Sequence, residues 1–298
     1  MTLRNQSFLD LREYDLTLTT ALTTRHGISG HLFEMIEYYY YFHFWKGVKS
    51  CIVISCDVKP EQFKTALERY DFTDDEKNDI LENTFFALKL MVISCNDIIF
   101  VDGKINETNE QRVVKAKHIY FLRCNNKERL ERADIVFQDN RMYDELSNSV
   151  HYVKKFLFSK FKKIEHSDDR YLMYLTSNTR MLDEKTFNSI INKYTNKRIL
   201  VISNEFKDYF KQDNIDFEFV PVCDIMSKFN EYIYTPLKPN HLYDCSPRFI
   251  TECAFYCKQI HFESPMYKGL DVRKYDIEHN LKGLELTKDD PLYDFIEI

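Results

Sequence analysis

Hydrophobic positions along the chain fall into short runs of strand length that alternate with stretches of helical periodicity. In the first half, the runs lie at 14–21, 49–56, 88–94, 97–101, 118–122 and 134–137, and helical periodicity lies at about 31–45 and 60–82. Near-continuous apolar strands separated by helices are typical of a parallel sheet that is covered on both faces. The pattern therefore predicts an α/β fold.

A second series of the same kind begins after residue 165. Predicted strands at 171–175, 198–203, 217–221, 231–235 and 259–262 alternate with predicted helices at about 184–194, 206, 223–229 and after Pro247. The segment 153–163, with five lysines and no acidic residue, and the polar stretch 165–169 separate the two series. We predict two Rossmann-like domains, 1–164 and 165–298, which face one another across a deep cleft, the second ending in a polar tail.

Length and composition agree with this division. A chain of 298 residues, 44% of them hydrophobic, can build two cores of about 150 residues each. No run of 18 apolar residues is present, so the sequence predicts no membrane insertion. The first 13 residues lack the apolar segment of a secretory signal, and we expect a cytoplasmic, monomeric protein.

Charge and cysteine usage exclude two further classes. A net charge of −6 argues against a protein that coats nucleic acid, although it leaves a local basic groove open. The eight cysteines are spread through the chain, mostly in apolar runs, and are interpreted as reduced core thiols. They show no zinc-finger spacing, and no acidic metal-binding motif is evident, so we expect neither a metal nor a cofactor.

The segment 23–30 lies between the first predicted strand and helix and contains two of the six glycines, Gly27 and Gly30. With Ser29 it forms a candidate acceptor loop, since glycines allow backbone N–H groups to approach a ligand. His26 and His31 flank the glycines, and either could act as a base. The spacing matches neither the dinucleotide fingerprint nor the P-loop. The alternative is a plain strand-to-helix turn.

A carboxylate, Asp102, follows the predicted strand 97–101. At the carboxyl end of a parallel strand it is a candidate general base for an acceptor hydroxyl. The alternative is a simple Asp-Gly turn, and Asp57 stands in the same relation to the predicted strand 49–56.

In the second half, the loop after the strand 171–175 carries Ser177, Asn178 and Arg180. Such side chains can donate several hydrogen bonds to a diphosphate, and the alternative is a helix-capping loop. Further on, Ser246 precedes a helix whose Arg248 and Glu252 share one face. This pair could bind a charged, hydroxyl-rich ligand, or it could be an ordinary surface ion pair.

Two other segments have a functional and a structural interpretation. Tyr232 and Tyr234 alternate in a predicted strand, where they could stack on a nucleobase or pack in the core. The lysines of 153–163 could bind a phosphate backbone or form the solvated face of a helix.

Taken together, the second half resembles the donor-binding domain of GT-B glycosyltransferases. The resemblance implies that Ser177, Asn178 and Arg180 contact the donor phosphates, that Arg248 neutralises the diphosphate with help from the helix start at Ser246, and that Glu252 binds the ribose. It implies a nucleotide sugar as the donor, arginines and helix N-termini in place of a metal ion, and the segment 27–30 on the acceptor side.

Among these enzymes, the chain is similar to phage-type DNA glycosyltransferases, which add a sugar to 5-hydroxymethylcytosine in double-stranded DNA. This implies transfer of glucose or a pentose such as arabinose from a UDP-sugar, in the host cytoplasm if a phage encodes the protein. The family carries its catalytic aspartate after an N-terminal-domain strand, whereas the matching strand here, 118–122, is followed by Arg123-Cys-Asn-Asn126. We therefore place the catalytic base on Asp102, or on His26. The alternatives are a glycan or lipopolysaccharide acceptor and a binding protein without turnover.

Overall fold

The computed structural model describes residues 8–20, 30–55, 58–87, 92–101, 113–122, 134–138, 150–152, 157–158, 160–175, 182–220, 225–235, 248–263 and 285–286. The chain divides into two compact units. The first comprises Met1–Lys162 and Glu285–Ile298, and the second comprises Lys163–Leu284. Whether 1–164 and 165–298 are the folding domains remains a prediction.

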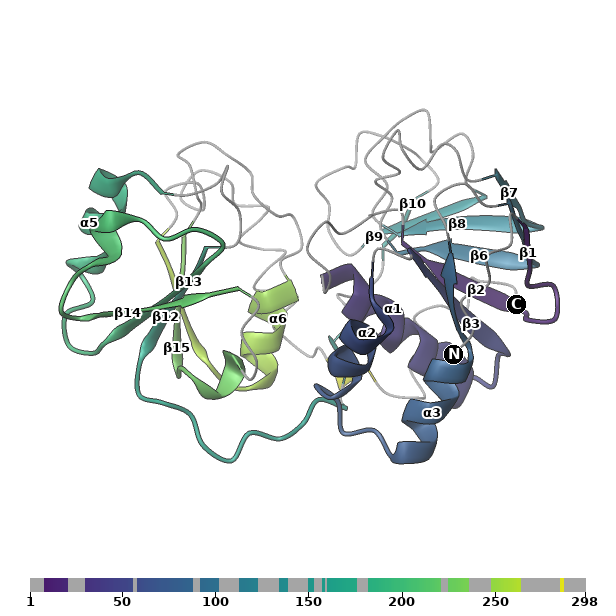
Figure 1. Cartoon of the computed structure of the whole chain (residues 1–298), viewed down its shortest axis with the longest axis horizontal. Helices are drawn as coiled ribbons and strands as arrows, with labels where there is room; N and C mark the ends of the chain where they lie inside the picture. The colour runs from purple at the N-terminus through teal and green to yellow at the C-terminus, as the bar shows by residue number, and fades with distance from the viewer. Residues whose placement is uncertain are drawn as a thin grey trace. The chain divides into compact units, whose positions relative to one another are not determined.

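A parallel sheet of seven strands is the centre of the first unit (Figure 1). Its strands are β2 (Leu16–Thr19), β3 (Ser50–Ser55), β4 (Thr84–Ala87), β6 (Asp97–Phe100), β8 (His118–Leu122), β9 (Ile135–Gln138) and β10 (Val150–Tyr152). In the sheet they run in the order β10-β9-β8-β6-β2-β3-β4. The chain therefore starts in the middle, adds β3 and β4 on one side, and returns to add β6 and the later strands on the other, which is the Rossmann order.

The apolar runs explain this sheet. All four residues of β2 are buried, and Cys51 to Ile54 of β3 are buried as well. Strands buried on both faces require such continuous runs, because each face is covered. The sequence pattern did not predict β4. Of the predicted strand 88–94, the structure describes Val92–Ser94 as a strand, β5.

The described residues of the first unit form four helical segments. α1 (Gly30–Tyr40) continues into a π-helix, Tyr41–Trp45, so the helix predicted at 31–45 is confirmed with a wider last turn. The periodic stretch 60–82 forms two helices, α2 (Pro60–Leu67) and α3 (Asp74–Glu82). The second begins at Thr73, whose hydroxyl accepts from the Glu76 N–H while the Glu76 carboxylate accepts from the Thr73 N–H. This capping box starts a new helix within the stretch.

The first unit also has a small parallel sheet, in the order β1-β5-β7. Each of its strands precedes a strand of the seven-stranded sheet along the chain. The strands of the small sheet are β1 (Phe8–Asp10), β5 (Val92–Ser94) and β7 (Val113–Lys115), each only a few residues before β2, β6 or β8. The Asn96 side chain donates to the carbonyls of Arg12 and Tyr14, at 3.0 and 2.8 Å, and so joins two of the connections. β1 and β7 are too short for the sequence pattern to predict.

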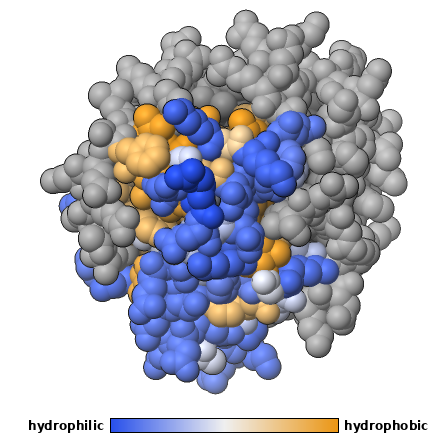
Figure 2. Space-filling model, turned by 90° about the vertical axis from the view of Figure 1, so that its right-hand side faces the viewer, coloured by the Kyte–Doolittle hydropathy of each residue, from blue (hydrophilic) through white to orange (hydrophobic). Residues whose placement is uncertain are grey.

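The face of the first unit shown in Figure 2 is mainly hydrophilic over its described residues, with smaller hydrophobic areas among them.

The described residues of the lysine-rich segment 153–163, namely 157–158 and 160–163, do not form the predicted solvated helix. The segment contains β11 (Leu157–Phe158), which pairs in parallel with β17 (Glu285–Leu286). Phe158 is fully buried and its ring contacts those of Tyr40, Tyr70 and Phe72. The prediction was wrong because the phenylalanines between the lysines provide an aromatic core, which outweighs the helical spacing of the charges.

The second unit has a five-stranded parallel sheet with the order β14-β13-β12-β15-β16 (Figure 1). Its strands are β12 (Tyr171–Leu175), β13 (Ile199–Ser203), β14 (Ile215–Phe219), β15 (Glu231–Tyr234) and β16 (Gln259–Phe262). Its described residues form the helices α5 (Glu184–Ile191) and α6 (Arg248–Phe255). Short 3₁₀ turns at Asp208–Phe210 and Ile225–Ser227 stand where helices were predicted at 206 and 223–229. This is again the Rossmann order.

Both faces of this sheet are covered. Met173 and Val201 are paired neighbours that pack with Phe187 of α5. The adjacent pair, Leu172 and Leu200, packs on the other face with Ile250 of α6. Successive strand residues point to opposite faces, so each apolar run supplies two cores. The α/β fold with two Rossmann-like units is confirmed, while a deep cleft between facing domains remains a prediction.

Candidate functional site

The strand order of the first sheet reverses between β2 and β6. Thr19 pairs with Phe100 at the carboxyl ends of these strands, and the Val101 N–H donates to the Thr19 carbonyl at 2.9 Å. From this point the chain leaves β2 toward one sheet edge and β6 toward the other. In open α/β sheets, ligands bind outside the carboxyl ends of strands at such a switch point.

The candidate residues of the first half follow these two strands. Asp102 comes directly after Val101, and His26, Gly27 and Ser29 lie in the connection that leaves β2; all four lie outside the described residues, as does Asp57 after β3. Gly30 is the first residue of α1. The topology thus assigns the candidates to the switch point, and their contacts remain predictions.

A histidine and a glutamate meet in the first turn of α1. His31 Nδ1 lies 3.5 Å from Glu34 Oε2, with side-chain exposures of 29% and 6%. Nδ1 itself is buried, and its approach to the carboxylate is an ion-pair distance and not a hydrogen bond. Sequence reasoning missed Glu34. The signal that identifies it is its spacing of three residues from His31 on a predicted helix.

The second sheet has its switch point between β12 and β15. These strands pair through Tyr171 with Glu231 and Leu172 with Tyr232. Residues 176–181, which include Ser177, Asn178 and Arg180, follow β12 and lie outside the described residues. Ser246 lies in the connection after β15 and is also outside them. That connection leads to α6, which begins at Arg248.

On α6, Glu252 is only 3% exposed. It shares the buried side of the helix with Ile250 and Cys253, which pack in the core. A buried carboxylate cannot belong to the solvent-exposed ion pair that was the structural alternative for Arg248 and Glu252. Only the backbone of Arg248 is among the described parts of the chain, so its role remains a prediction.

One expectation near this helix is corrected, and one alternative is decided. The cysteines were interpreted as core thiols, but Cys257 is exposed and adopts a positive φ of 54°. There the helix ends, with the Lys258 N–H donating to the Cys253 carbonyl at 2.8 Å. Tyr232 and Tyr234 are buried in the core cluster that also contains Phe229, so core packing explains them and a stacking face does not.

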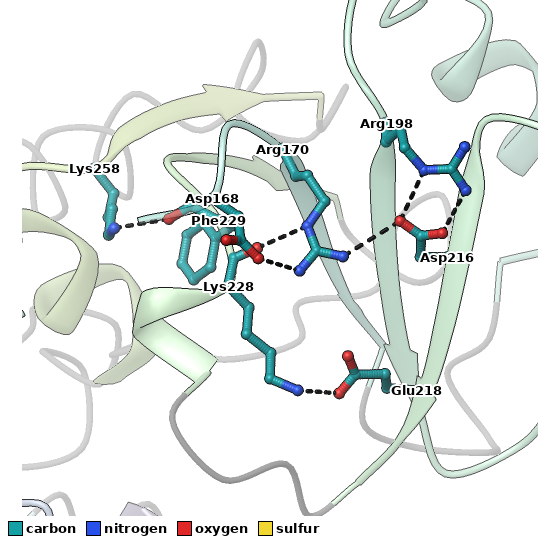
Figure 3. A network of polar contacts seen from close by, with 8 residues as sticks. All are labelled: Asp168, Arg170, Arg198, Asp216, Glu218, Lys228, Phe229 and Lys258. Atoms are coloured by element: carbon teal, nitrogen blue, oxygen red, sulfur yellow. Dashed lines mark hydrogen bonds and ion pairs between the residues drawn. The ribbon is translucent and has the colours of Figure 1, made fainter. Parts of the chain in front are cut away.

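The opposite, amino edge of the second sheet is held by ion pairs (Figure 3). Arg170, just before β12, donates to Asp168 at 2.5 Å, to Asp216 at 3.3 Å and to the Lys228 carbonyl at 3.2 Å. Arg198, just before β13, donates to both oxygens of Asp216. Hydrogen bonds from Arg198 hold the pKa of Asp216 below its usual 3.8, against partial burial, and Arg170 adds to the effect.

These contacts connect the starts of neighbouring strands. Because ligands bind at the carboxyl edge of such sheets, we assign the network to stability. A buried lysine belongs to the same edge: Lys258 Nζ donates to Ser167 Oγ at 2.5 Å and to the Phe229 carbonyl at 2.7 Å. Burial lowers the pKa of Lys258 below 10.5.

The described parts of the chain contain neither a metal-binding cluster nor a membrane-spanning helix. There, His, Cys, Asp and Glu side chains form no group of three or more that could bind a metal ion. Over the same residues, no helix has the length and hydrophobicity needed to cross a membrane.

The fold and the two switch points define an α/β protein with Rossmann-order sheets. No protein-family model matches the chain, and no curated protein matches it significantly. Among solved structures, it is similar to the apo form of the lipopolysaccharide outer core galactosyltransferase WaaB. The two share 7% sequence identity with a TM-score of 0.45, over 93% of this chain and 92% of the other.

Proposed function

We propose that the protein is a glycosyltransferase that moves a sugar from a UDP-sugar to a hydroxyl acceptor. One observation carries this proposal. In the second sheet, the strands that flank the switch point are β12 and β15. Every candidate donor residue follows one of them: Ser177, Asn178 and Arg180 after β12, and Ser246, Arg248 and Glu252 after β15. This strand order supports a common ligand position for residues that are distant in sequence.

The residue types suit a nucleotide sugar. Arg180 and Arg248 would balance the charge of the diphosphate as it leaves, with hydroxyl and amide donors from Ser177, Asn178 and Ser246. Glu252 would accept hydrogen bonds from neighbouring ribose hydroxyls. Its side chain is 3% exposed on α6, the helix that follows β15.

The first unit would serve the acceptor. Asp102 after β6, or His26 after β2, would take the proton of the acceptor hydroxyl, and Gly27, Ser29 and Gly30 would contact the acceptor. These positions belong to the switch point of that sheet.

The acceptor that the sequence resemblance favours is 5-hydroxymethylcytosine in double-stranded DNA. The second class of acceptor is a glycan hydroxyl, and one observation weighs against DNA. Lys160 lies 3.7 Å from Glu76, and Lys162 lies 3.3 Å from Glu68. Lysines paired with carboxylates release no counterions from a phosphate backbone, so these two add little to DNA binding.

A transfer assay tests the proposal. The protein is incubated with radiolabelled UDP-glucose or UDP-arabinose and with hydroxymethylcytosine DNA, unmodified DNA of the same sequence, or lipopolysaccharide. We expect label only in the hydroxymethylated DNA, and loss of transfer in Arg248→Ala and Glu252→Ala with the fold retained. Label in lipopolysaccharide alone selects the glycan acceptor. Incorporation that ignores the hydroxymethyl group contradicts the DNA acceptor, and donor binding without turnover identifies a binding protein.

A further inference from the structure

We propose that the outer edge of β14 pairs with the same edge of a second copy of this chain, in antiparallel orientation and with Phe217 opposite the partner's Phe217. The dimer goes beyond the proposed function and does not depend on it. It replaces the monomer that the sequence led us to expect.

The outer edge of β14 presents backbone groups that can pair with another strand. β14 ends the order β14-β13-β12-β15-β16, and in the described part of the chain it pairs with β13 alone (Figure 1). The Val220 N–H donates to the Ser203 carbonyl at 3.2 Å. Alternate residues of a strand bond to the same neighbour, so 216, 218 and 220 bond to β13. Phe217 and Phe219 therefore direct their N–H and carbonyl groups to the open edge, which is a template for a further strand.

These groups match their own copy across a two-fold axis at Phe217. Residues that face each other in this way form a hydrogen-bonded pair, so Phe217 and the partner's Phe217 exchange two N–H···O bonds. Two residues away, the Phe219 N–H of each chain meets the Ile215 carbonyl of the other. The Ile215 N–H is not needed, and it already donates to the Gln212 carbonyl at 3.0 Å.

The sequence of β14 has the same symmetry. The strand is Ile-Asp-Phe-Glu-Phe, with an acid on each side of Phe217 and an apolar residue at each end. A two-fold interface needs a surface that is complementary to itself. With Phe217 at the axis, Ile215 lies opposite the partner's Phe219, and Asp216 lies opposite the partner's Glu218. Apolar residues thus meet apolar residues on one face, and the acids are confined to the other face.

The apolar face carries exposed phenylalanines beside this edge. Phe219 is 60% exposed and Phe206 is 39% exposed. The ring of Phe217 contacts both, with centroid distances of 4.8 Å to Phe219 and 5.0 Å to Phe206, and it packs against the core that includes Phe210. Single exposed apolar side chains are normal, whereas these rings adjoin each other at an unpaired strand. A second copy would cover them, since aromatic pairs across strands stabilise a sheet.

The acidic face does not prevent the pairing. Carboxylates directly opposite each other repel, but each acid here already has a cation. Arg198 donates to both oxygens of Asp216, and Lys228 Nζ donates to Glu218 at 2.5 Å (Figure 3). Arg198 precedes β13, so it holds Asp216 from the inner side of the strand and leaves the outer edge open. The charge that the two copies bring together is therefore balanced.

Sedimentation equilibrium of the full chain over a series of concentrations tests the dimer. Pairing of one short strand buries little area, so we expect an average mass that rises with concentration from one chain to two. Phe219→Pro should raise the dissociation constant at least about tenfold, because proline removes the outward N–H. The fold should tolerate this change, since a proline at a sheet edge is accepted where its N–H would face solvent.

A charge at the same position provides a second variant that keeps the backbone. Phe219→Lys should also raise the dissociation constant at least about tenfold, because an edge lysine opposes strand pairing. The matched control is Phe262→Lys. Phe262 is the last residue of β16, the strand at the other end of the sheet, and is 40% exposed. This variant should dimerise like the wild type.

Oxidation of cysteine variants tests the register. The Cα atoms of a hydrogen-bonded antiparallel pair lie about 5.5 Å apart, within the range of a disulfide. Phe217→Cys should therefore form a covalent dimer on a non-reducing gel. Phe219→Cys carries the same native cysteines and is the control, since its two copies would lie four residues out of register, roughly 13 Å apart.

Three results overturn the dimer: the mass of one chain at every concentration, an unchanged dissociation constant in folded Phe219→Lys, or equal cross-linking of the two cysteine variants. Assemblies that grow beyond two copies also overturn it, because pairing between two different edges does not close. None of these measurements uses a nucleotide sugar, so their outcome is separate from that of the transfer assay.

Discussion

Replacing Arg170 by methionine tests the assignment of the amino-edge network to stability. Methionine keeps an apolar stem and removes the guanidinium. Three hydrogen bonds are lost, to Asp168, Asp216 and the Lys228 carbonyl. The Arg170 side chain is 21% exposed, and Asp168, at 48%, is the most exposed of its two acidic partners.

The expected magnitude follows from these contacts. A typical hydrogen bond contributes about 0.5–1.5 kcal/mol net, and an exposed ion pair such as the one with Asp168 contributes little. We therefore expect a loss of about 2 kcal/mol in the free energy of unfolding. For a unit of about 120 residues, this lowers the melting temperature by about 8 °C.

Scanning calorimetry measures the shift, and Arg12→Met is the matched control. Arg12 forms the same kind of ion pair with Asp10, but both side chains are exposed, so the melting temperature should stay within error. Donor affinity of folded Arg170→Met should equal that of the wild type, because the network lies at the edge away from the switch point. An unchanged melting temperature, or loss of donor binding by the folded variant, would refute the reasoning.

Three further predictions concern single contacts. The pKa of Asp216 is lowered in the fold, so the stability that its carboxylate provides is full above its unfolded value of about 3.8 and is lost as the pH falls through the folded value. In Asp216→Asn, the free energy of unfolding, measured by denaturation at a series of acidic pH values, should therefore fall less steeply with falling pH. An unchanged pH dependence would contradict the ion pair. Phe158→Ala should cost about 3–5 kcal/mol in urea unfolding, because the side chain is fully buried among aromatic rings; a cost under about 1 kcal/mol would exclude that core. Of the cysteines that the structure describes, Cys257 should react first with a thiol reagent, since burial raises the pKa of Cys51 to about 12 and of Cys95 to about 11 and Cys253 is buried; equal rates would show that the core opens.

The sequence predicted those elements whose apolar runs are long. β12 and β16 have the predicted bounds, β13 begins one residue after its predicted start, and β3 lies within the predicted strand 49–56. In β12 and β13 such runs are visible because both faces of the strand are buried, whereas β16 is half-buried or exposed along its length. Short strands such as β1 and β10 carry three residues each, too few for a pattern. The aromatic core around Phe158 was hidden because lysines dominate the composition of its segment.

The candidate site was predicted in its chain positions and not in its contacts. The residues after β12 and β15 could be identified as candidates, because the loop after a parallel strand begins where the apolar run of that strand ends. That these two strands are neighbours could not be read, since strand order is set by packing across the whole sheet. Glu252 shows the same limit: its spacing from Arg248 is in the sequence, whereas its burial depends on how α6 packs against the sheet.

The central claim is that the carboxyl edge of the second sheet binds a nucleotide sugar. Titration calorimetry with UDP-glucose tests it most directly, on the wild type, Arg180→Ala, Glu252→Gln and Arg170→Met. The account predicts saturable binding to the wild type, affinity at least about tenfold weaker in the first two variants, which is about 1.4 kcal/mol, and unchanged affinity in Arg170→Met. Equal affinity in all four proteins, or no binding to the wild type, would contradict it.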